Sequence, residues 1–126
     1  MPAFYKIDKD RRLVMSSGSG VLTKGMILAH MDLLSNDPEF DPSFSQITDF
    51  TQLTGMDIGP EDIHQLAQRN IFSARSRRAF VVKNNLQFGL ARMFQTYREL
   101  NGETGIRVFR TIDEALDWIL VEKAAS

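Results

Sequence analysis

The chain opens with two short stretches in which apolar and polar residues alternate. Residues 4–8 carry Tyr5 and Ile7 in one alternating set, and residues 11–17 carry Leu13 and Met15 in another. Alternation of this kind is typical of half-buried β-strands, because successive side chains point to opposite faces of a sheet. The charged residues between the two stretches favour a turn. We therefore predict a β-hairpin here.

Four later stretches repeat apolar residues at helical spacing. The first begins after Thr23, whose hydroxyl can cap it, and ends before Asp37. The second begins at Pro60, where the fixed φ of proline suits the first helical position. The third spans residues 85–100, and the fourth opens after Thr111 with the spacing of a capping box. The inward stripe of the third is predicted to contain Leu86, Leu90, Met93, Tyr97 and Leu100.

Three further segments read as strands between these helices, at residues 46–50, 78–83 and 106–109. The second of them has four consecutive apolar residues and is the best candidate for the centre of the sheet, since such a run suits a strand covered on both faces. The order β-β-α-β-α-β-α-β-α predicts an α/β fold in which a single mixed, mostly parallel five-stranded sheet is flanked by about four helices. No linker or repeat is visible, so residues 1–126 are predicted to form a single domain.

Composition narrows the functional classes. The chain has 126 residues, 43% of them apolar, which suits one domain with a sizeable core. It contains no cysteine, so disulfides, thiolate metal sites and cysteine nucleophiles are excluded. No run of eighteen apolar residues could span a bilayer, and the N-terminus lacks the apolar core of a signal peptide. We therefore predict a cytoplasmic protein without an integral membrane segment.

Charge is segregated along the chain although the net charge is only −1. Residues 25–68 contain eight acids and no lysine or arginine, whereas residues 63–98 contain seven basic residues and no acid. The two blocks could pair within one chain, pair between the chains of a dimer, or offer a basic face to an anionic ligand. The near-neutral total predicts no nucleic-acid partner. The basic cluster at the start of the strand predicted at residues 78–83 is expected to be a solvated edge: Arg75, Arg77 and Arg78.

The polar motifs point to no catalytic chemistry. Gly18 and Gly20 lie between a strand and a helix but match neither phosphate-binding consensus. His30 and His64 lie on different predicted helices and lack the spacing of metal ligands. We therefore predict that the protein is not an enzyme and that it has no metal and no cofactor.

The more suggestive signal is surplus apolar surface. Five residues could line an apolar pocket under the proline-stiffened loop at residues 37–44: Met15, Met26, Leu33, Phe40 and Phe44. Phe88 and Trp118 lie off the predicted inward stripes of their helices and are candidates for a subunit interface. Packing in the core remains the alternative for most of these side chains. The predicted partners are thus a nonpolar small molecule, another protein, or a second copy of the chain in a homodimer.

The element order and several local segments resemble the SpoIIAA-like family of small bacterial proteins, most of them uncharacterised. The resemblance rests on the acidic and aromatic loop 37–44 leading into Gln46-Ile47-Thr48-Asp49-Phe50, on Ser76-Arg77-Arg78-Ala79, and on Ala91-Arg92-Met93-Phe94. It implies the STAS-like and CRAL-TRIO-like architecture, a mixed sheet flanked by helices. The CRAL-TRIO-like side implies a nonpolar ligand such as a lipid, so a non-enzymatic binding function is expected.

A second function is implied by the better-understood relatives, which are anti-sigma-factor antagonists. They switch partners through a phosphorylated serine in a turn at the start of the second helix, and the similar turn here is Asp57-Ile58-Gly59. Ile58 has no hydroxyl to accept a phosphate, so the phosphorylation switch is predicted to be inactive. The alternative function is therefore a partner-switching regulator that lacks the phosphorylatable serine.

Overall fold

The computed structural model describes residues 3–125, with side chains described as far as Val121. Within these residues the chain forms seven strands and four helices. They are β1 (Ala3–Asp8), β2 (Leu13–Gly18), β3 (Gly20–Thr23), α1 (Lys24–Ser35), β4 (Ser45–Asp49), β5 (Leu53–Asp57), α2 (Pro60–Leu66), β6 (Arg78–Val81), α3 (Asn85–Leu100), β7 (Ile106–Phe109) and α4 (Ile112–Ala125).

Five of these strands form one mixed sheet in the order β1-β2-β4-β6-β7. The hairpin strands β1 and β2 are antiparallel, and each remaining pair of neighbours is parallel. The predicted α/β class and the five-stranded, mostly parallel sheet are therefore confirmed. The central place belongs to β4, however, and β6 lies next to it with all four of its residues buried.

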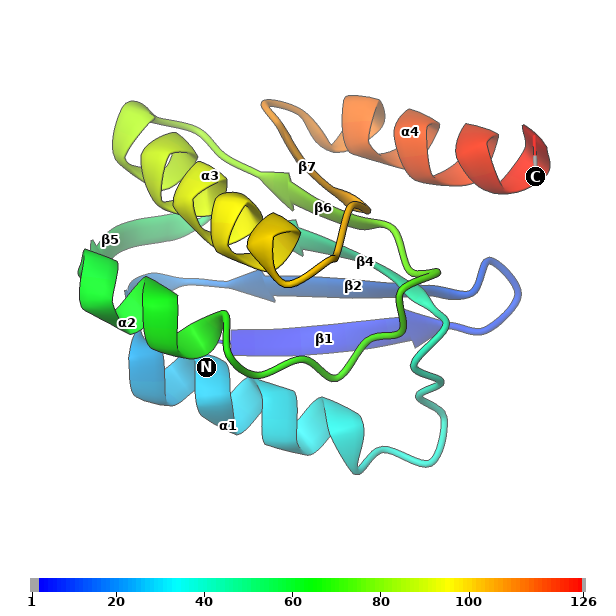
Figure 1. Ribbon diagram of the computed structural model, residues 1–126, viewed down its shortest axis with the longest axis horizontal. Helices are drawn as coiled ribbons and strands as arrows, with labels where there is room; N and C mark the ends of the chain where they lie inside the picture. Colours follow the sequence, from blue (N-terminus) through cyan, green and yellow to red (C-terminus); the bar gives the residue numbers. More distant parts are fainter. Residues whose placement is uncertain (1–2, 126) are drawn as a thin grey trace.

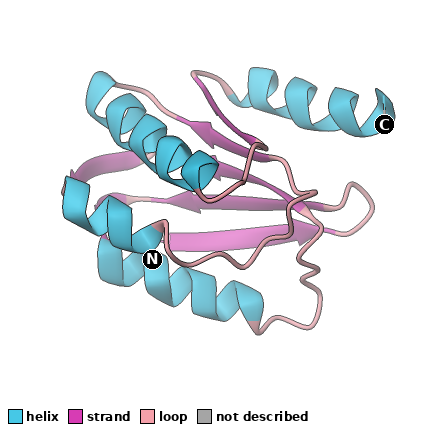
Figure 2. Cartoon of the chain, in the orientation of Figure 1, coloured by secondary structure: helices cyan, strands magenta, loops and turns pink. Residues whose placement is uncertain are grey.

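Helices cover both faces of this sheet. Figure 1 shows α1, α2 and α3 grouped together, with α4 set apart from them at the upper right. The core beneath α4 contains Leu13, Ile47, Ala79, Val81, Ala115 and Ile119. The alternate residues of the same strands, including Val14 and Phe80, face the other three helices, and so does Val82 directly after β6. Figure 2 shows the long loop that joins α2 to β6 on the side of these helices.

A second, two-stranded parallel sheet formed by β3 and β5 was not predicted from the sequence. Both strands are short, and β5 has Gly55 at its centre, which weakens any alternation of apolar residues. β3 leads directly into α1, and β5 leads into α2. Leu22 of β3 and Leu53 of β5 are both buried and add to the apolar core beneath these helices.

The inward face of α3 is also rotated from the predicted stripe. Leu86 and Leu100 are 58% and 79% exposed, whereas Gln87 and Arg98 are buried. Gln87 takes an inward place because its amide donates to the carbonyl of Phe50 and accepts from the backbone of Lys83. A pattern of apolar residues alone cannot anticipate an inward polar residue of this kind.

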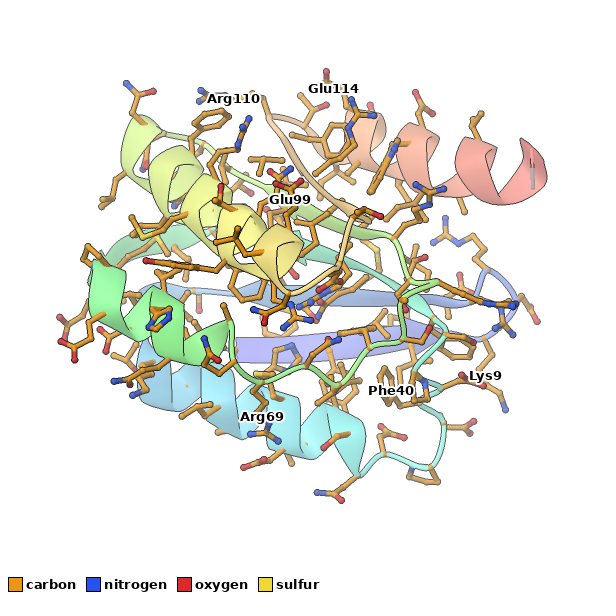
Figure 3. All side chains as sticks on the ribbon, viewed as in Figure 1. Lys9, Phe40, Arg69, Glu99, Arg110 and Glu114 are labelled. Atoms are coloured by element: carbon orange, nitrogen blue, oxygen red, sulfur yellow. The ribbon has the colours of Figure 1, made fainter. Side chains whose placement is uncertain are left out.

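The two charge blocks meet within the chain through an ion pair between Arg69 and Asp32. The Nη2 atom of Arg69 lies 2.5 Å from Oδ1 of Asp32, which joins the loop after α2 to α1 (Figure 3). The carboxylate is largely exposed, so this pair adds little stability. It shows that at least part of the segregated charge is paired inside one molecule.

A close backbone approach at Gly105 fixes how the loop before β7 meets the start of β6. The carbonyl of Gly105 accepts a 2.7 Å hydrogen bond from the amide of Arg78, and a Cβ at residue 105 would lie 2.5 Å from the carbonyl oxygen of Ser76. We expect Gly105→Ala to reduce the free energy of unfolding by about 1–3 kcal/mol, because backbone must shift to admit the methyl group. Chemical denaturation measures this loss.

Gly89→Ala is the matched control for that substitution. Gly89 lies within α3, and an added Cβ there meets nothing within 4 Å. Alanine is the better helix former, so this variant should be as stable as the wild type or more stable by about 0.5–1 kcal/mol. Equal effects of the two substitutions would show that the contact at Gly105 is unimportant.

Candidate functional site

The candidate site is a cavity of about 120 Å³ between the main sheet and the three grouped helices. The sheet provides its floor, α1, α2 and α3 provide its roof, and the β3–β5 pair closes one end. Most of the lining is apolar. The apolar side chains include Leu22, Ile27, Met31, Leu34, Phe50, Leu53, Met56, Ile58, Ile63, Leu66, Ile71, Phe72, Phe80, Leu90, Ala91 and Phe94.

A row of polar side chains crosses the floor of this cavity. Ser16 of β2, Gln46 of β4 and Arg78 of β6 are all buried, and all three line the cavity. They share one face of the sheet because paired residues of neighbouring strands point the same way. Gln46 is paired with Arg78 and with Val14, and Ser16 lies two residues after Val14 in β2. A polar floor under an apolar roof is typical of sites for small molecules, where a few polar groups fix the orientation of a ligand.

His30 of α1 connects the roof to this row. Its Nε2 atom lies 2.8 Å from the hydroxyl of Ser16, and that hydroxyl accepts a 3.0 Å hydrogen bond from the amide of Gln46. The ring of Tyr5 stacks on the imidazole at 5.4 Å. Burial lowers the pKa of His30 below its usual value, because the charged imidazolium would lose water. The Nε2 atom of a neutral ring can accept a hydrogen bond from the hydroxyl of Ser16, so the polar atoms at this end of the row have hydrogen-bond partners.

Arg78 is the most unusual residue of the site. Its guanidinium lies over the ring of Phe72 at 4.8 Å and over the ring of Phe94 at 5.4 Å, and both rings line the cavity. Burial lowers the pKa of Arg78, and the nearby carboxylate of Glu103 opposes that shift. The prediction of a solvated edge is therefore wrong for Arg78, although Arg75 is exposed as expected.

Glu103 is shared between two buried arginines. Its Oε1 atom accepts a 2.7 Å hydrogen bond from Nε of Arg98, whose Nη1 also donates to the carbonyl of Ala67. The contacts from Nη1 of Arg78 to the same carboxylate are longer, at 3.4 and 3.5 Å. The Nε atom of Arg78 is buried and has no acceptor among the described residues. Arg98 thus holds Glu103 closely, and Arg78 holds it weakly.

The five residues predicted to form a pocket do not line this cavity. Met15 packs beneath α4 on the opposite face of the sheet, and Phe40 and Phe44 lie in the cluster around Val14 and Leu34. The rings of Phe40 and Phe72 meet edge to face with their centroids 5.4 Å apart, so Phe40 packs against a residue of the cavity wall. Met26 and Leu33 border a shallower groove between α1 and β1, together with Phe4. Their role in binding a ligand stays a prediction.

The two predicted interface residues are partly covered by arginines of the same chain. Arg92 and Arg110 lie over the ring of Phe88, at 6.0 and 4.8 Å from its centroid. Arg77 and Arg107 lie 5.6 Å from the ring of Trp118. Both rings remain partly exposed, and their participation in a dimer stays a prediction.

The turn that resembles the phosphorylation switch contributes to the cavity. Asp57 ends β5 and is exposed, whereas Ile58 is buried and lines the cavity, and Gly59 is the N-cap of α2. Within the described residues, no group of three His, Cys, Asp or Glu side chains could hold a metal ion. No helix in that part of the chain is long and apolar enough to cross a membrane.

The sequence contains a signal for the burial of Arg78 that the prediction of a solvated edge overlooked. Arg78 is in phase with Phe80 and Val82, so a strand that begins at Arg78 must point its arginine to the same buried face. The link between Ser16 and His30 carries no such signal, because the two residues are joined only by how α1 packs on β2.

The half-buried imidazole of His30 predicts a measurable dependence of stability on pH. The unfolded chain binds a proton at His30 more readily than the folded chain, since burial lowers the folded pKa. Stability from this residue is therefore present above the ordinary imidazole pKa of about 6.5 and is lost progressively as pH falls below that value. We expect His30→Gln to have a smaller loss of unfolding free energy over this range, as measured by chemical denaturation at several pH values. Parallel curves for the two proteins would contradict this account.

Comparison with known proteins identifies the fold. No protein-family model matches the chain, and no curated protein matches it. A similar solved structure is that of an uncharacterised protein of the DUF3478 family from Shewanella loihica, described as having a SpoIIAA-like fold. The two structures agree with a TM-score of 0.58 over 94% of each chain, at 18% sequence identity. The chain therefore has a SpoIIAA-like fold, as its resemblance to that family predicted.

Proposed function

We propose that this protein is a non-enzymatic binding protein that holds a small, largely nonpolar molecule between its sheet and α1, α2 and α3. The observation that carries the proposal is the cavity of about 120 Å³ with its mainly apolar lining. Protein cores are normally packed to crystal-like density, so a void of this size is uncommon. Apolar voids are attractive to apolar ligands, because filling them restores dispersion contacts that the lining lacks.

The size of the cavity selects the kind of ligand. A void of roughly 150 Å³ lined by aliphatic and aromatic residues can hold benzene. The present cavity is slightly smaller, so it suits one ring or a short aliphatic chain. A long lipid tail would require the helices of the roof to move apart. We therefore favour a small molecule over a membrane lipid.

The contacts of His30 favour binding over catalysis. A catalytic serine–histidine pair needs a third group that orients the imidazole. Ser16 and His30 are hydrogen-bonded, but among the described residues no carboxylate is hydrogen-bonded to the imidazole, whose face stacks on Tyr5. Gln46 also donates to the Ser16 hydroxyl and occupies a lone pair of its oxygen. The Ser16 hydroxyl thus has both a donor and an acceptor, which is typical of a structural hydrogen-bond network and not of a free nucleophile.

The alternative function is a partner-switching regulator without the phosphorylatable serine. Ile58, in the turn that resembles the switch, is buried against the cavity and presents no hydroxyl. This position supports ligand binding more directly than partner switching. A pull-down that recovers a kinase-like partner, and that depends on Asp57, would favour the regulator instead.

Filling the cavity should abolish binding without unfolding the protein. Ala91 of α3 is buried and lines the cavity, so Ala91→Leu adds three carbons to the void. We expect this variant to keep wild-type stability or to gain up to about 1 kcal/mol, and to lose the binding of benzene or toluene. Isothermal titration calorimetry measures the affinity, and native mass spectrometry of freshly purified protein shows whether a copurified ligand is lost.

The matched control places the same substitution on the other face of the sheet. Ala115 of α4 is fully buried in the closely packed core beneath that helix. Ala115→Leu should destabilise the protein by about 1–3 kcal/mol through overpacking, yet the folded protein should still bind the ligand. Undiminished binding by Ala91→Leu would place the ligand elsewhere.

We also propose that the protein forms a homodimer, and Phe88 offers the test. This ring is only partly covered by Arg92 and Arg110, so a charge at its position would oppose an apolar interface. Phe88→Asp should shift the protein from dimer to monomer in size-exclusion chromatography with light scattering, with an unchanged far-ultraviolet circular dichroism spectrum. A monomeric wild type, or a variant that remains dimeric, would remove Phe88 from any interface.

A further inference from the structure

We propose that the molecule held in this cavity is a carboxylate and that Arg78 binds its carboxyl group, an inference that rests on the ligand-binding function proposed above. The ligand class is a single ring or short chain that ends in one carboxylate, of which benzoate is a simple representative. Three features of the site support it: an excess of buried positive charge, unused hydrogen-bond donors, and a guanidinium held in place at the cavity.

The buried charges near the cavity do not balance. Arg78 and Arg98 are 7% and 8% exposed, and Glu103 is 4% exposed. One carboxylate therefore faces two guanidinium groups, and Arg98 takes the shorter contact with it. The positive charge of Arg98 also acts on Arg78 and favours its neutral form. A buried charge without a full partner is costly, so an incoming anion would relieve an existing electrostatic penalty.

Arg78 also has hydrogen-bonding capacity to spare. A guanidinium has five N–H donors in a planar fork, and the hydrogen bonds of the Arg78 side chain to described residues are the two long contacts to Glu103. The buried Nε donor has no acceptor in that part of the chain. Buried donors are normally satisfied, so an unsatisfied one beside a cavity indicates a missing acceptor.

The surroundings of Arg78 suit a carboxylate attached to an apolar body. Phe72 and Phe94 contact the guanidinium and also line the cavity, so a ligand ring can pack against the same side chains that position the charge. A planar carboxylate matches the planar fork and can accept two parallel hydrogen bonds. Its single negative charge also balances the single excess positive charge of the buried cluster formed by Arg78, Arg98 and Glu103, whereas a phosphate would bring a larger polar group into a mainly apolar space.

Gln46 lies beside Arg78 and provides a second polar group that can contact the ligand carboxylate. It is paired with Arg78 in the ladder between β4 and β6, and it lines the same cavity. Its amide already donates to Ser16, which in turn contacts His30. The carboxylate should therefore lie at the Arg78 end of the row, with the apolar part of the ligand toward the roof helices.

The test compares two ligands of the same shape, benzoate and neutral benzamide, by calorimetric titration of the full chain at pH 7.5. The wild type should bind benzoate at least about tenfold more tightly, because charge-assisted hydrogen bonds to a guanidinium are the stronger kind. Arg78→Met should reduce that preference to within about twofold. Glu103 keeps its close partner Arg98 in this variant, so the protein should remain folded.

Arg77→Met is the matched control, since Arg77 is the preceding residue and lies against Trp118 of α4 on the other side of the sheet. This variant should retain the full preference for benzoate. If Arg78→Met does not fold, Arg78→Lys serves in its place, and it should reduce the preference at least about threefold because an ammonium lacks the planar fork.

The outcomes separate this inference from the proposed function. Equal affinities of the wild type for benzoate and benzamide would overturn the role of a carboxylate, while binding itself would stand. A preference that survives in Arg78→Met would overturn the role of Arg78. Failure of the wild type to bind benzoate, benzamide and benzene would overturn the proposed function together with the inference.

Discussion

The buried ion pair of Arg98 and Glu103, with Arg78 beside it, is the constraint on which the rest of the structure depends. Arg78 begins β6, Glu103 lies in the loop before β7, and Arg98 is in the last turns of α3. Arg98 also donates to the carbonyl of Ala67, directly after α2. One cluster of charges therefore joins α2 and α3 to the end of the sheet at which β6 and β7 begin. Charged groups taken out of water must keep such partners, so these elements cannot shift independently.

This constraint explains why a cavity can persist in a small domain. An apolar interface usually closes around a void, because tighter packing gains dispersion energy. Here the inward polar residues hold α1 and α3 at fixed positions over the sheet, through His30 on Ser16 and through Gln87 on the Phe50 carbonyl. The space left between these anchors is lined by apolar side chains. The polar contacts therefore set the distance between the helices and the sheet, and the apolar side chains make the space between them apolar.

The parts of this structure that follow from local pattern were predictable from the sequence. The hairpin, the buried run of β6 and the capped starts of the helices each depend on residues close together in the chain. The positions of Gln87 and Arg98 were not predictable in this way, because their partners lie on other elements. The predicted pocket residues illustrate the same limit. Met15 is correctly assigned to a strand, but whether its face meets α4 or the cavity depends on which helices cover each side.

A crystal structure of the protein with benzoate tests ligand binding at Arg78 most directly. We expect the ring among the apolar residues of the roof and the carboxylate within hydrogen-bonding distance of Arg78. An empty cavity, or benzoate bound only in the outer groove beside Leu33, would contradict binding at this site.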